Sequence, residues 1–343
     1  MVQLSVLDHV LMPPGVGAHE ALNEAVESAV LAESLGYERI WFSEHHNAAG
    51  LACTAPELII ARAAAATGAI RVGAGGIMLP NHAPLKVAEL FNTLEAMYPG
   101  RIDLGLGRAP GTDGRTATAL RGSREAVVDV DFAAMAADLF GFLDGDLPDD
   151  HPFARVRADP AVPAPPRVWM LGSSEHGSAY AAAHGLPFCF AHQIDPDYAV
   201  PLLRRYRDAF RPSARAAAPY SSVSVIAFAA EDPEPAEDFT AFWSLHTARA
   251  RSGERVATSL GQAREFRSGP GYAATARAAA DRIVAGTPEQ VGRRLRALAE
   301  QAHADEVLVA TPMPDGAARR RSFELLAAEF GLTPHREAPA SRY

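Results

Sequence analysis

The glycine-rich segment at residues 103–114, DLGLGRAPGTDG, has a composition suited to holding a ligand. Its four glycines surround Arg108, and glycine allows a backbone to approach a phosphate closely. The spacing excludes both common phosphate motifs. A dinucleotide fingerprint needs a third glycine where Pro110 stands, and the single lysine, Lys86, lacks the glycine frame of a P-loop. We therefore expect this segment to form one wall of a phosphate site, with Arg108 as an anion ligand.

A second segment, residues 171–185 (LGSSEHGSAYAAAHG), places small and hydroxyl-bearing residues at the predicted start of a helix. Free backbone N–H groups and the positive end of the helix dipole attract anions there. Arg108 is expected to reach the same place from the neighbouring strand end. The candidate phosphate ligands in this turn are Ser173, Ser174, Gly177 and Ser178. A serine-rich helix cap beside an exposed arginine is the alternative, and the spacing alone does not decide between the two.

The sequence EHHNAAGLACTAPE at residues 44–57 brings a carboxylate, two imidazoles and a thiol close together. Glu44, His45 and His46 are consecutive, so at a strand end their side chains alternate in direction and do not all face one ion. The pairing at i and i+4 of helical zinc sites is also missing, and we predict no metal site. Cys53 is interpreted as a small buried thiol at the start of a helix rather than a nucleophile.

Three glycines stand in an otherwise apolar predicted strand within residues 73–84, GAGGIMLPNHAP. Glycine inside a strand marks a bulge or the close approach of another group. A planar ring lying against Gly75 and Gly76 would require the absence of side chains. Tight packing between neighbouring strands would require it as well, and both interpretations stay open.

Short apolar runs alternate with longer amphipathic patterns, which is typical of βα units with a parallel sheet. The number of predicted strands favours a (β/α)8 TIM barrel, because doubly wound sheets usually have about five or six strands. In such a barrel the functional residues lie at the carboxyl ends of the strands. The eight predicted strands are residues 4–8, 39–44, 70–79, 101–107, 167–173, 187–192, 221–230 and 305–311. The candidates that follow them include Asp8, His9, His45, Arg108, Ser173, His192 and Thr311.

Two insertions interrupt the alternation, one after strand four and one after strand seven. A helix is predicted at residues 123–143, followed by an irregular, Pro- and Asp-rich excursion at 144–166. Residues 231–286 exceed one barrel helix, and long segments of this kind are usually lids, binding loops or disordered. The predicted organisation is a single domain over residues 1–335 with a tail at 336–343. Thr287 and Pro288 open a further predicted helix with favourable capping residues.

Composition narrows the classes of partner and compartment. The 343 residues carry a net charge of −9 without a basic stripe, which disfavours nucleic acid as a partner. The two cysteines do not make a disulfide framework, and the first ten residues lack the basic region of a signal peptide. No apolar stretch approaches the roughly 20 residues of a membrane helix. We therefore expect a cytoplasmic protein without membrane or nucleic-acid contacts.

Three stretches together resemble the bacterial luciferase-like flavin-dependent monooxygenases: WFSEHHN, the long run IRVGAGGIMLPNHAPLKVAELFNTLEAMYPGRIDLGLGRAPG, and RVWMLGSSEHGSAYAAAHGLPF. The resemblance extends to about residue 195 and returns at GTPEQV and the last strand. It implies a barrel that binds reduced FMN, or in some members a deazaflavin, and often a homodimer formed through helices two and three. It also implies that a non-proline cis peptide at Gly75-Gly76 lies beneath the flavin ring.

By the same resemblance, Arg108, Ser173, Ser174, Gly177 and Ser178 match the phosphate-binding positions, and His45 matches the histidine near the reactive edge of the flavin. The strand-five turn lacks the acidic residue of the light-emitting members, which argues against bioluminescence. The segment after strand seven shows no matching that would identify a substrate.

The resulting hypothesis is a two-component monooxygenase. A separate NAD(P)H:flavin reductase supplies reduced FMN, because the chain has no nicotinamide fingerprint, and one oxygen atom from O2 passes to a small organic substrate. We expect His45 to act as the acid/base, residues 231–286 to be the lid, and the substrate to be a natural-product ring. The alternatives are a deazaflavin-dependent dehydrogenase on the same barrel, a non-catalytic flavin-binding protein and, more remotely, a metal-dependent barrel hydrolase.

Overall fold

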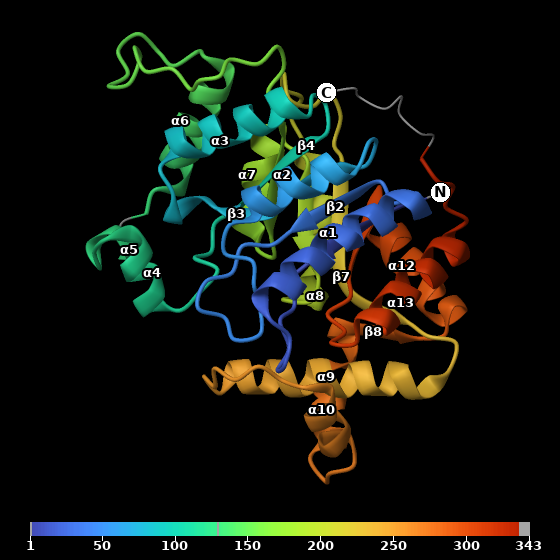
Figure 1. Cartoon of the computed structure of the whole chain (residues 1–343). Coiled ribbons are helices and arrows are strands. Elements are labelled where there is room, and N and C mark those ends of the chain that lie inside the picture. Colours follow the sequence, from blue (N-terminus) through green and yellow to red (C-terminus); the bar gives the residue numbers. More distant parts are fainter. Residues whose placement is uncertain (1, 129, 336–343) are drawn as a thin grey trace.

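A computed structural model describes residues 2–128 and 130–335, in which parallel strands form a closed barrel surrounded by helices (Figure 1). Eight of the nine strands in these residues close the barrel in the order β1-β2-β3-β4-β5-β6-β7-β9 and back to β1. The expected (β/α)8 barrel is confirmed. The barrel strands are β1 (Gln3–Asp8), β2 (Arg39–Phe42), β3 (Arg71–Met78), β4 (Ile102–Gly107), β5 (Arg167–Gly172), β6 (Phe188–Ala191), β7 (Ser221–Ala229) and β9 (Glu306–Ala310).

The ninth strand, β8 (Ile283–Gly286), was not predicted from the sequence. It pairs with the last four residues of β7, whereas β9 pairs with residues 222–226 of the same strand. β7 is long enough to hold both neighbours along its length, so β8 extends the sheet beyond the closed barrel. Its four residues, IVAG, are too few to give a recognisable strand pattern.

Helices follow the strands and pack around the barrel (Figure 1). The predicted start at Thr287 is confirmed as a capping box, in which the Thr287 hydroxyl accepts from Gln290 N and the Gln290 side chain accepts from Thr287 N. The helices are α1 (Ala18–Leu35), α2 (Pro56–Ala66), α3 (Pro84–Met97), α4 (Gly114–Arg121), α5 (Glu125–Val128), α6 (Phe132–Asp144), α7 (Glu175–Ala183), α8 (Pro196–Ala209), α9 (Pro233–Arg251), α10 (Leu260–Arg267), α11 (Tyr272–Ala279), α12 (Pro288–Ala302) and α13 (Gly316–Phe330), with single 3-10 turns η1 (Leu79–Asn81) and η2 (Ala280–Arg282).

The predicted continuous helix at residues 123–143 is wrong. α4 ends at Arg121 and is followed by Gly122, which adopts a left-handed conformation with φ of 85°. In the described residues the short α5 comes next, and α6 begins at Phe132. The Asp131 side chain accepts a hydrogen bond from Ala134 N and so fixes the start of α6. The end of α4 and the start of α6 are therefore set by the glycine and aspartate at the helix ends rather than by the spacing of apolar residues.

The two predicted insertions lie at opposite ends of the barrel (Figure 1). Residues 145–166 contain no helix or strand and lead into the start of β5, as predicted for an irregular excursion. Residues 231–286 instead form α9, α10, α11 and β8, and α9 extends across the carboxyl ends of the strands. The single-domain assignment for residues 1–335 stays a prediction, and the expected tail at 336–343 lies outside the described residues.

The amino-terminal end of the barrel interior is filled by paired charges. Arg39 Nε lies 2.7 Å from Glu306 Oε1, and its Nη1 lies 2.6 Å from Asp103 Oδ2. All three side chains are fully buried, and Trp41 Nε1 donates to Asp103 Oδ2 at 3.0 Å. The Trp41 ring also meets the Trp169 ring edge to face at a centroid distance of 5.0 Å. This cluster closes one end of the barrel and leaves the other end to the candidate site.

No helix in the described part of the chain combines the length and apolar character needed to span a bilayer.

Candidate active site

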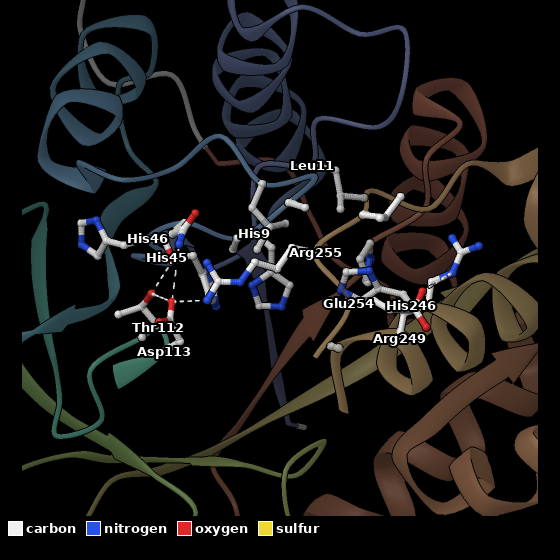
Figure 2. A pocket seen from close by; sticks show the side chains of 18 of the residues that line it. His9, Leu11, His45, His46, Thr112, Asp113, His246, Arg249, Glu254 and Arg255 are labelled. Atoms are coloured by element: carbon white, nitrogen blue, oxygen red, sulfur yellow. Dashed lines mark hydrogen bonds and ion pairs between the residues drawn. The ribbon is translucent and has the colours of Figure 1, made fainter. Parts of the chain in front are cut away.

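Two cavities lie at the carboxyl ends of the strands, and both are lined by His9 and His45. The first, of about 310 Å³ and here called the barrel cavity, lies among the strand ends. The second, of about 420 Å³ and here called the lid cavity, lies between the β1, β2 and β4 loops and the segment containing α9 (Figure 2). The barrel cavity is lined among others by Trp41, Gly75, Gly76, Arg108, Ser173, Ser174 and Gly177. The lid cavity is lined among others by Asp113, Trp243, His246, Arg249 and Arg255.

The residues predicted to hold a phosphate converge on one side of the barrel cavity. Ser174 caps α7 by accepting a hydrogen bond from Gly177 N at 3.4 Å, and Ser173 precedes it at the end of β5. Arg108 follows β4, is exposed, and forms no ion pair with any residue that the structure describes. The cavity therefore offers a guanidinium, two hydroxyls and a helix amino terminus to an anion.

The packing of the protein does not require glycine at position 177. A Cβ built on Gly177 would meet only Phe188 Cε2 and Ser174 Oγ, both at an ordinary 3.9 Å, and a Cβ on the neighbouring Gly172 would meet nothing within 4 Å. The fold would accept a larger residue at both places, and both positions line the barrel cavity, where a small residue leaves room for a ligand.

Ser178 differs from the other predicted phosphate ligands. It is buried on α7, its hydroxyl donates to the Glu175 carbonyl at 3.1 Å, and it does not line the barrel cavity. The helical spacing explains this difference, because residues at the fourth position of α7 turn toward the barrel wall rather than toward the strand-five turn. The structure therefore brings three of the four predicted residues of this turn to the cavity.

Gly75 and Gly76 line the barrel cavity, and the peptide bond between them is cis, as the family resemblance implies. Packing also requires both glycines. A Cβ on Gly75 would lie 2.7 Å from Leu7 Cδ1 and 2.9 Å from Trp41 Cβ, and one on Gly76 would lie 2.7 Å from the Gly105 carbonyl oxygen. Both interpretations of these glycines are therefore compatible. The packing of the neighbouring strands requires them, and their backbone lines the cavity without side chains.

Glu44 and His46 turn away from His45, as alternation at a strand end predicts. The buried Glu44 carboxylate accepts hydrogen bonds from Met78 N at 2.8 Å and pairs with His46 and His82. Burial acts to raise the pKa of Glu44, but the hydrogen bonds from His82, Met78 N and His46 outweigh it and lower the pKa. Glu44 thus ties the β2 end to the β3 end. Among the described residues, no group of three or more His, Cys, Asp or Glu side chains is arranged to hold a metal ion.

His45 lies beside His9 at the boundary between the two cavities. Their rings meet edge to face at a centroid distance of 5.6 Å, and Ser43 Oγ lies within hydrogen-bond distance of both. Burial lowers the pKa of His45, and burial together with His45 and His246 lowers the pKa of His9 to about 3. Both imidazoles are therefore neutral at neutral pH, so each ring has one N–H and one lone-pair nitrogen.

Both cysteines are buried, and burial raises the pKa of each thiol. Cys53 precedes α2, as expected for a small core residue, and packs in the hydrophobic core. Cys189 lines the barrel cavity, with a pKa raised to about 12. A thiol of this pKa carries almost no thiolate at neutral pH, so neither side chain is suited to be a nucleophile.

The lid cavity contains residues that the sequence alone did not identify. Trp243, His246 and Arg249 come from one face of α9, and Arg255 follows in the loop before α10. Figure 2 shows Arg255 reaching across to Asp113, and the two side chains form an ion pair of 2.7 Å. Asp113 also caps α4, so this contact links the α9–α10 segment to the loop after β4. The only sequence signal was that α9 lies in a segment too long for a barrel helix.

The model of the family described as luciferase-like monooxygenase matches residues 2–306. The chain is 38% identical to a luciferase-like monooxygenase of Escherichia coli over 94% of this chain and 96% of that protein. It is 33% identical to the N-acetyl-S-alkylcysteine monooxygenase of Bacillus subtilis over 95% and 98% of the two chains. The crystal structure of apo-MsnO8 superimposes with a TM-score of 0.89 at 36% identity, covering 98% of this chain and 100% of that one.

Proposed function

Since the chain belongs to the luciferase-like monooxygenase family, an oxidoreductase family, we propose that it uses reduced FMN and O2 to insert one oxygen atom into a small organic substrate. The observation that supports this best is the barrel cavity, which joins an anion-binding end to bare strand backbone and to neutral histidines. Such a cavity suits a cofactor that has a phosphate tail and a planar ring.

The residues that would hold the cofactor are those of the barrel cavity. Arg108, Ser173, Ser174 and the amino terminus of α7 would bind the phosphate, and Gly177 would let it approach. The ring would lie against Gly75 and Gly76, between the apolar side chains around them. When bound, reduced FMN supplies the electrons with which O2 is activated; the protein supplies orientation and exclusion of water.

His45 is the proposed acid/base. Its side chain lines both the barrel cavity, where the cofactor would lie, and the lid cavity, where the substrate would lie. The lowered pKa caused by burial keeps the ring neutral, so it can take up a proton at one nitrogen while the other is hydrogen bonded. His46 does not share this position, because its ring pairs with Glu44.

The segment 231–286 is the proposed lid over the substrate. Trp243, His246 and Arg249 of α9 form one side of the lid cavity, and the ion pair between Arg255 and Asp113 fastens the following loop to the barrel. Excluding water would protect reactive species formed in the barrel cavity. Because one relative is an N-acetyl-S-alkylcysteine monooxygenase, thioethers are the first substrates to screen, followed by aromatic rings.

Two partners belong to the same proposal. A separate NAD(P)H:flavin reductase would supply the reduced cofactor, since the chain has no nicotinamide fingerprint. A second copy of the chain would pack against α2 and α3, where Leu58 is 68% exposed and Met97 is 51% exposed. Sedimentation equilibrium of the wild type and of a Leu58→Glu, Met97→Glu variant tests the dimer: a monomeric wild type would contradict it.

The test of function combines binding with turnover. Titration with FMN and with anaerobically reduced FMN measures affinity, and turnover is then followed with a flavin reductase, 18O2 and the substrate screen. We expect products that carry one atom of 18O. Hydride transfer to or from substrate without O2 consumption would identify a dehydrogenase, and FMN binding without any turnover would identify a flavin-binding protein; either result contradicts the proposal. A reaction without the protein controls for oxidation by free reduced flavin.

A further inference from the structure

Ser43 occupies a position between two histidines that come from different strands. Its Oγ lies 2.8 Å from His9 Nδ1 and 3.2 Å from His45 Nδ1. The Ser43 side chain is 2% exposed, and the residue directly follows β2, whose pairing with β1 places it beside the end of that strand. The backbone of Ser43 also donates to the Asp8 carbonyl at 3.2 Å. The hydroxyl is therefore held in place, and the two imidazole contacts are fixed features of the site.

The single hydroxyl proton of Ser43 limits which of the two histidine contacts it can donate to. A serine hydroxyl has one proton to donate, and a neutral imidazole has one N–H and one lone-pair nitrogen. If Ser43 donates to Nδ1 of one histidine, it accepts from Nδ1–H of the other. The two rings then carry their protons on different nitrogens: one ring is protonated at Nδ1 and the other at Nε2.

The opposite edges of both rings are free to meet a ligand. Neither His9 Nε2 nor His45 Nε2 forms a hydrogen bond to a described residue, and both side chains line both cavities. One ring thus presents a lone pair at Nε2, and the other presents an N–H. The cavities contain a paired base and acid built from two neutral histidines.

We infer that Ser43 is a positioning residue that couples the tautomers of His9 and His45, so that a proton taken up by one ring is matched by a proton released from the other. In one direction, His45 gains a proton at Nε2 and passes its Nδ1 proton to Ser43 Oγ. Ser43 passes its own proton to His9 Nδ1, and His9 releases its Nε2 proton into the cavity. Each atom ends with its normal valence, and no ring becomes charged.

This transfer suits the surroundings of the two rings. Burial lowers the pKa of both rings most, and His246 of α9 lowers both further. His46 also lowers the pKa of His45 and Glu44 raises it. Burial and Arg249 of α9 lower the pKa of His246. A charged imidazolium is unfavourable among so many neighbouring imidazoles in a buried place. A relay that moves a proton without creating a charge avoids that cost. Its use during oxygenation rests on the proposed function, whereas the coupling of tautomers does not.

The tautomers are measured in the full chain without any ligand. Long-range 1H–15N correlation spectra separate protonated from unprotonated imidazole nitrogens, and spectra of His9→Gln and His45→Gln variants assign the two sets of signals. We expect one of the two histidines to be protonated at Nδ1 and the other at Nε2. If both histidines have the same tautomer in the wild type, the inference is wrong. This measurement does not require a Ser43 variant.

Substitution of Ser43 supplies the control. Ser43→Ala should remove the Nδ1–H form from both rings, and Ser43→Thr, which keeps the hydroxyl, should restore opposite tautomers. Unchanged tautomers in a folded Ser43→Ala protein would also overturn the coupling. Circular dichroism establishes folding, and FMN titration of the same variants establishes separately whether the barrel cavity binds flavin. If the protein does not bind flavin but the two histidines keep opposite tautomers, the proposed function is wrong and the coupling of tautomers stands.

Discussion

At the amino-terminal end of the barrel interior the charged groups pair with one another, whereas at the carboxyl end comparable polar groups face cavities. Arg39, Asp103 and Glu306 are fully buried, and their ion pairs are 2.6 and 2.7 Å long. Arg108 at the other end has no ion-pair partner among the described residues. The charge of a paired guanidinium is already balanced by its carboxylate partners. An unpaired guanidinium at a cavity is available to bind an anion.

The glycines divide in the same way. Gly75 and Gly76 are needed by the packing of neighbouring strands, since an added Cβ on either would lie within 3 Å of another atom. Gly172 and Gly177 are not needed by any packing, because an added Cβ would meet at most an ordinary contact. Packing therefore accounts for Gly75 and Gly76 but not for Gly172 and Gly177, which leave open space at the barrel cavity.

The largest expected effect concerns the amino-terminal cluster. Asp103→Ala leaves Arg39 buried with one carboxylate fewer, and we expect it to lower the free energy of unfolding by about 3–5 kcal/mol. Urea unfolding followed by circular dichroism measures the loss. Arg321→Ala is the control: it removes the ion pairs of Arg321 with Glu231 and Glu324, all about half-exposed side chains, and should cost at most about 1 kcal/mol. Equal losses in the two variants would remove the distinction between the two regions.

His45→Ala tests the opposite end, where turnover rather than stability should change. Loss of a well-placed acid/base lowers the rate roughly 10²–10⁴-fold, whereas the free energy of unfolding should change little. Oxygenated product per minute, measured by mass spectrometry, gives the rate. His19, an exposed histidine on α1, supplies the matched control, and His19→Ala should retain full activity. A His45→Ala protein with wild-type turnover would exclude His45 from the chemistry.

Arg108→Ala should weaken FMN binding without weakening the fold. A hydrogen bond to a charged group contributes about 1.5–3 kcal/mol, which corresponds to roughly 10- to 100-fold in Kd. Isothermal titration measures Kd, and riboflavin, which lacks the phosphate, is the matched ligand control. We expect the variant and the wild type to bind riboflavin alike. A variant that loses affinity for riboflavin as strongly as for FMN would show that Arg108 does not act through the phosphate.

The buried histidines predict a pH dependence of stability. The pKa of His9 is lowered from 6.5 to about 3 by burial, so below pH 6.5 the unfolded chain binds a proton that the folded chain does not. Stability from this residue is present above pH 6.5 and is lost as the pH falls toward 3. His9→Gln should reduce the loss between pH 7 and pH 5 by about 2 kcal/mol relative to the wild type. Urea unfolding at the two pH values measures this loss, and an equal loss of free energy of unfolding in His9→Gln and the wild type would contradict a buried neutral His9.

The smallest effect is expected at the lid. Arg255→Ala removes the ion pair with Asp113 from a partly exposed position, where such pairs contribute at most about 1 kcal/mol. We expect KM for substrate to rise a few-fold while FMN affinity stays the same. Arg251→Ala changes a neighbouring exposed arginine of α9 and should have no effect on KM. A similar rise in both variants would indicate a general charge effect rather than a specific lid contact.

Local patterns predicted most of the framework. Apolar runs and capping residues located all eight barrel strands and the Thr287 capping box, because these signals act between residues close in sequence. The same logic was wrong at residues 123–143, where α5 ends at Val128 and Asp131 caps a separate helix, α6. β8 escaped prediction because a strand of four residues depends on its partner, β7, rather than on its own pattern.

The candidate site was predictable only in part, for a physical reason. Seven of the eight residues singled out for a role line the barrel cavity because strand ends of a barrel meet at one place: His45, Gly75, Gly76, Arg108, Ser173, Ser174 and Gly177. Ser178 does not, since helical periodicity turns it inward. The contacts of Ser43, His246 and Arg255 join segments far apart in the chain, and no local spacing encodes such contacts.

A crystal structure of this chain grown with FMN tests the proposed cofactor site most directly. We expect density for the phosphate between Arg108 and the turn formed by Ser173, Ser174 and Gly177, with the ring against Gly75 and Gly76. Density for FMN at another place, or a barrel cavity that stays empty at saturating FMN, would contradict it.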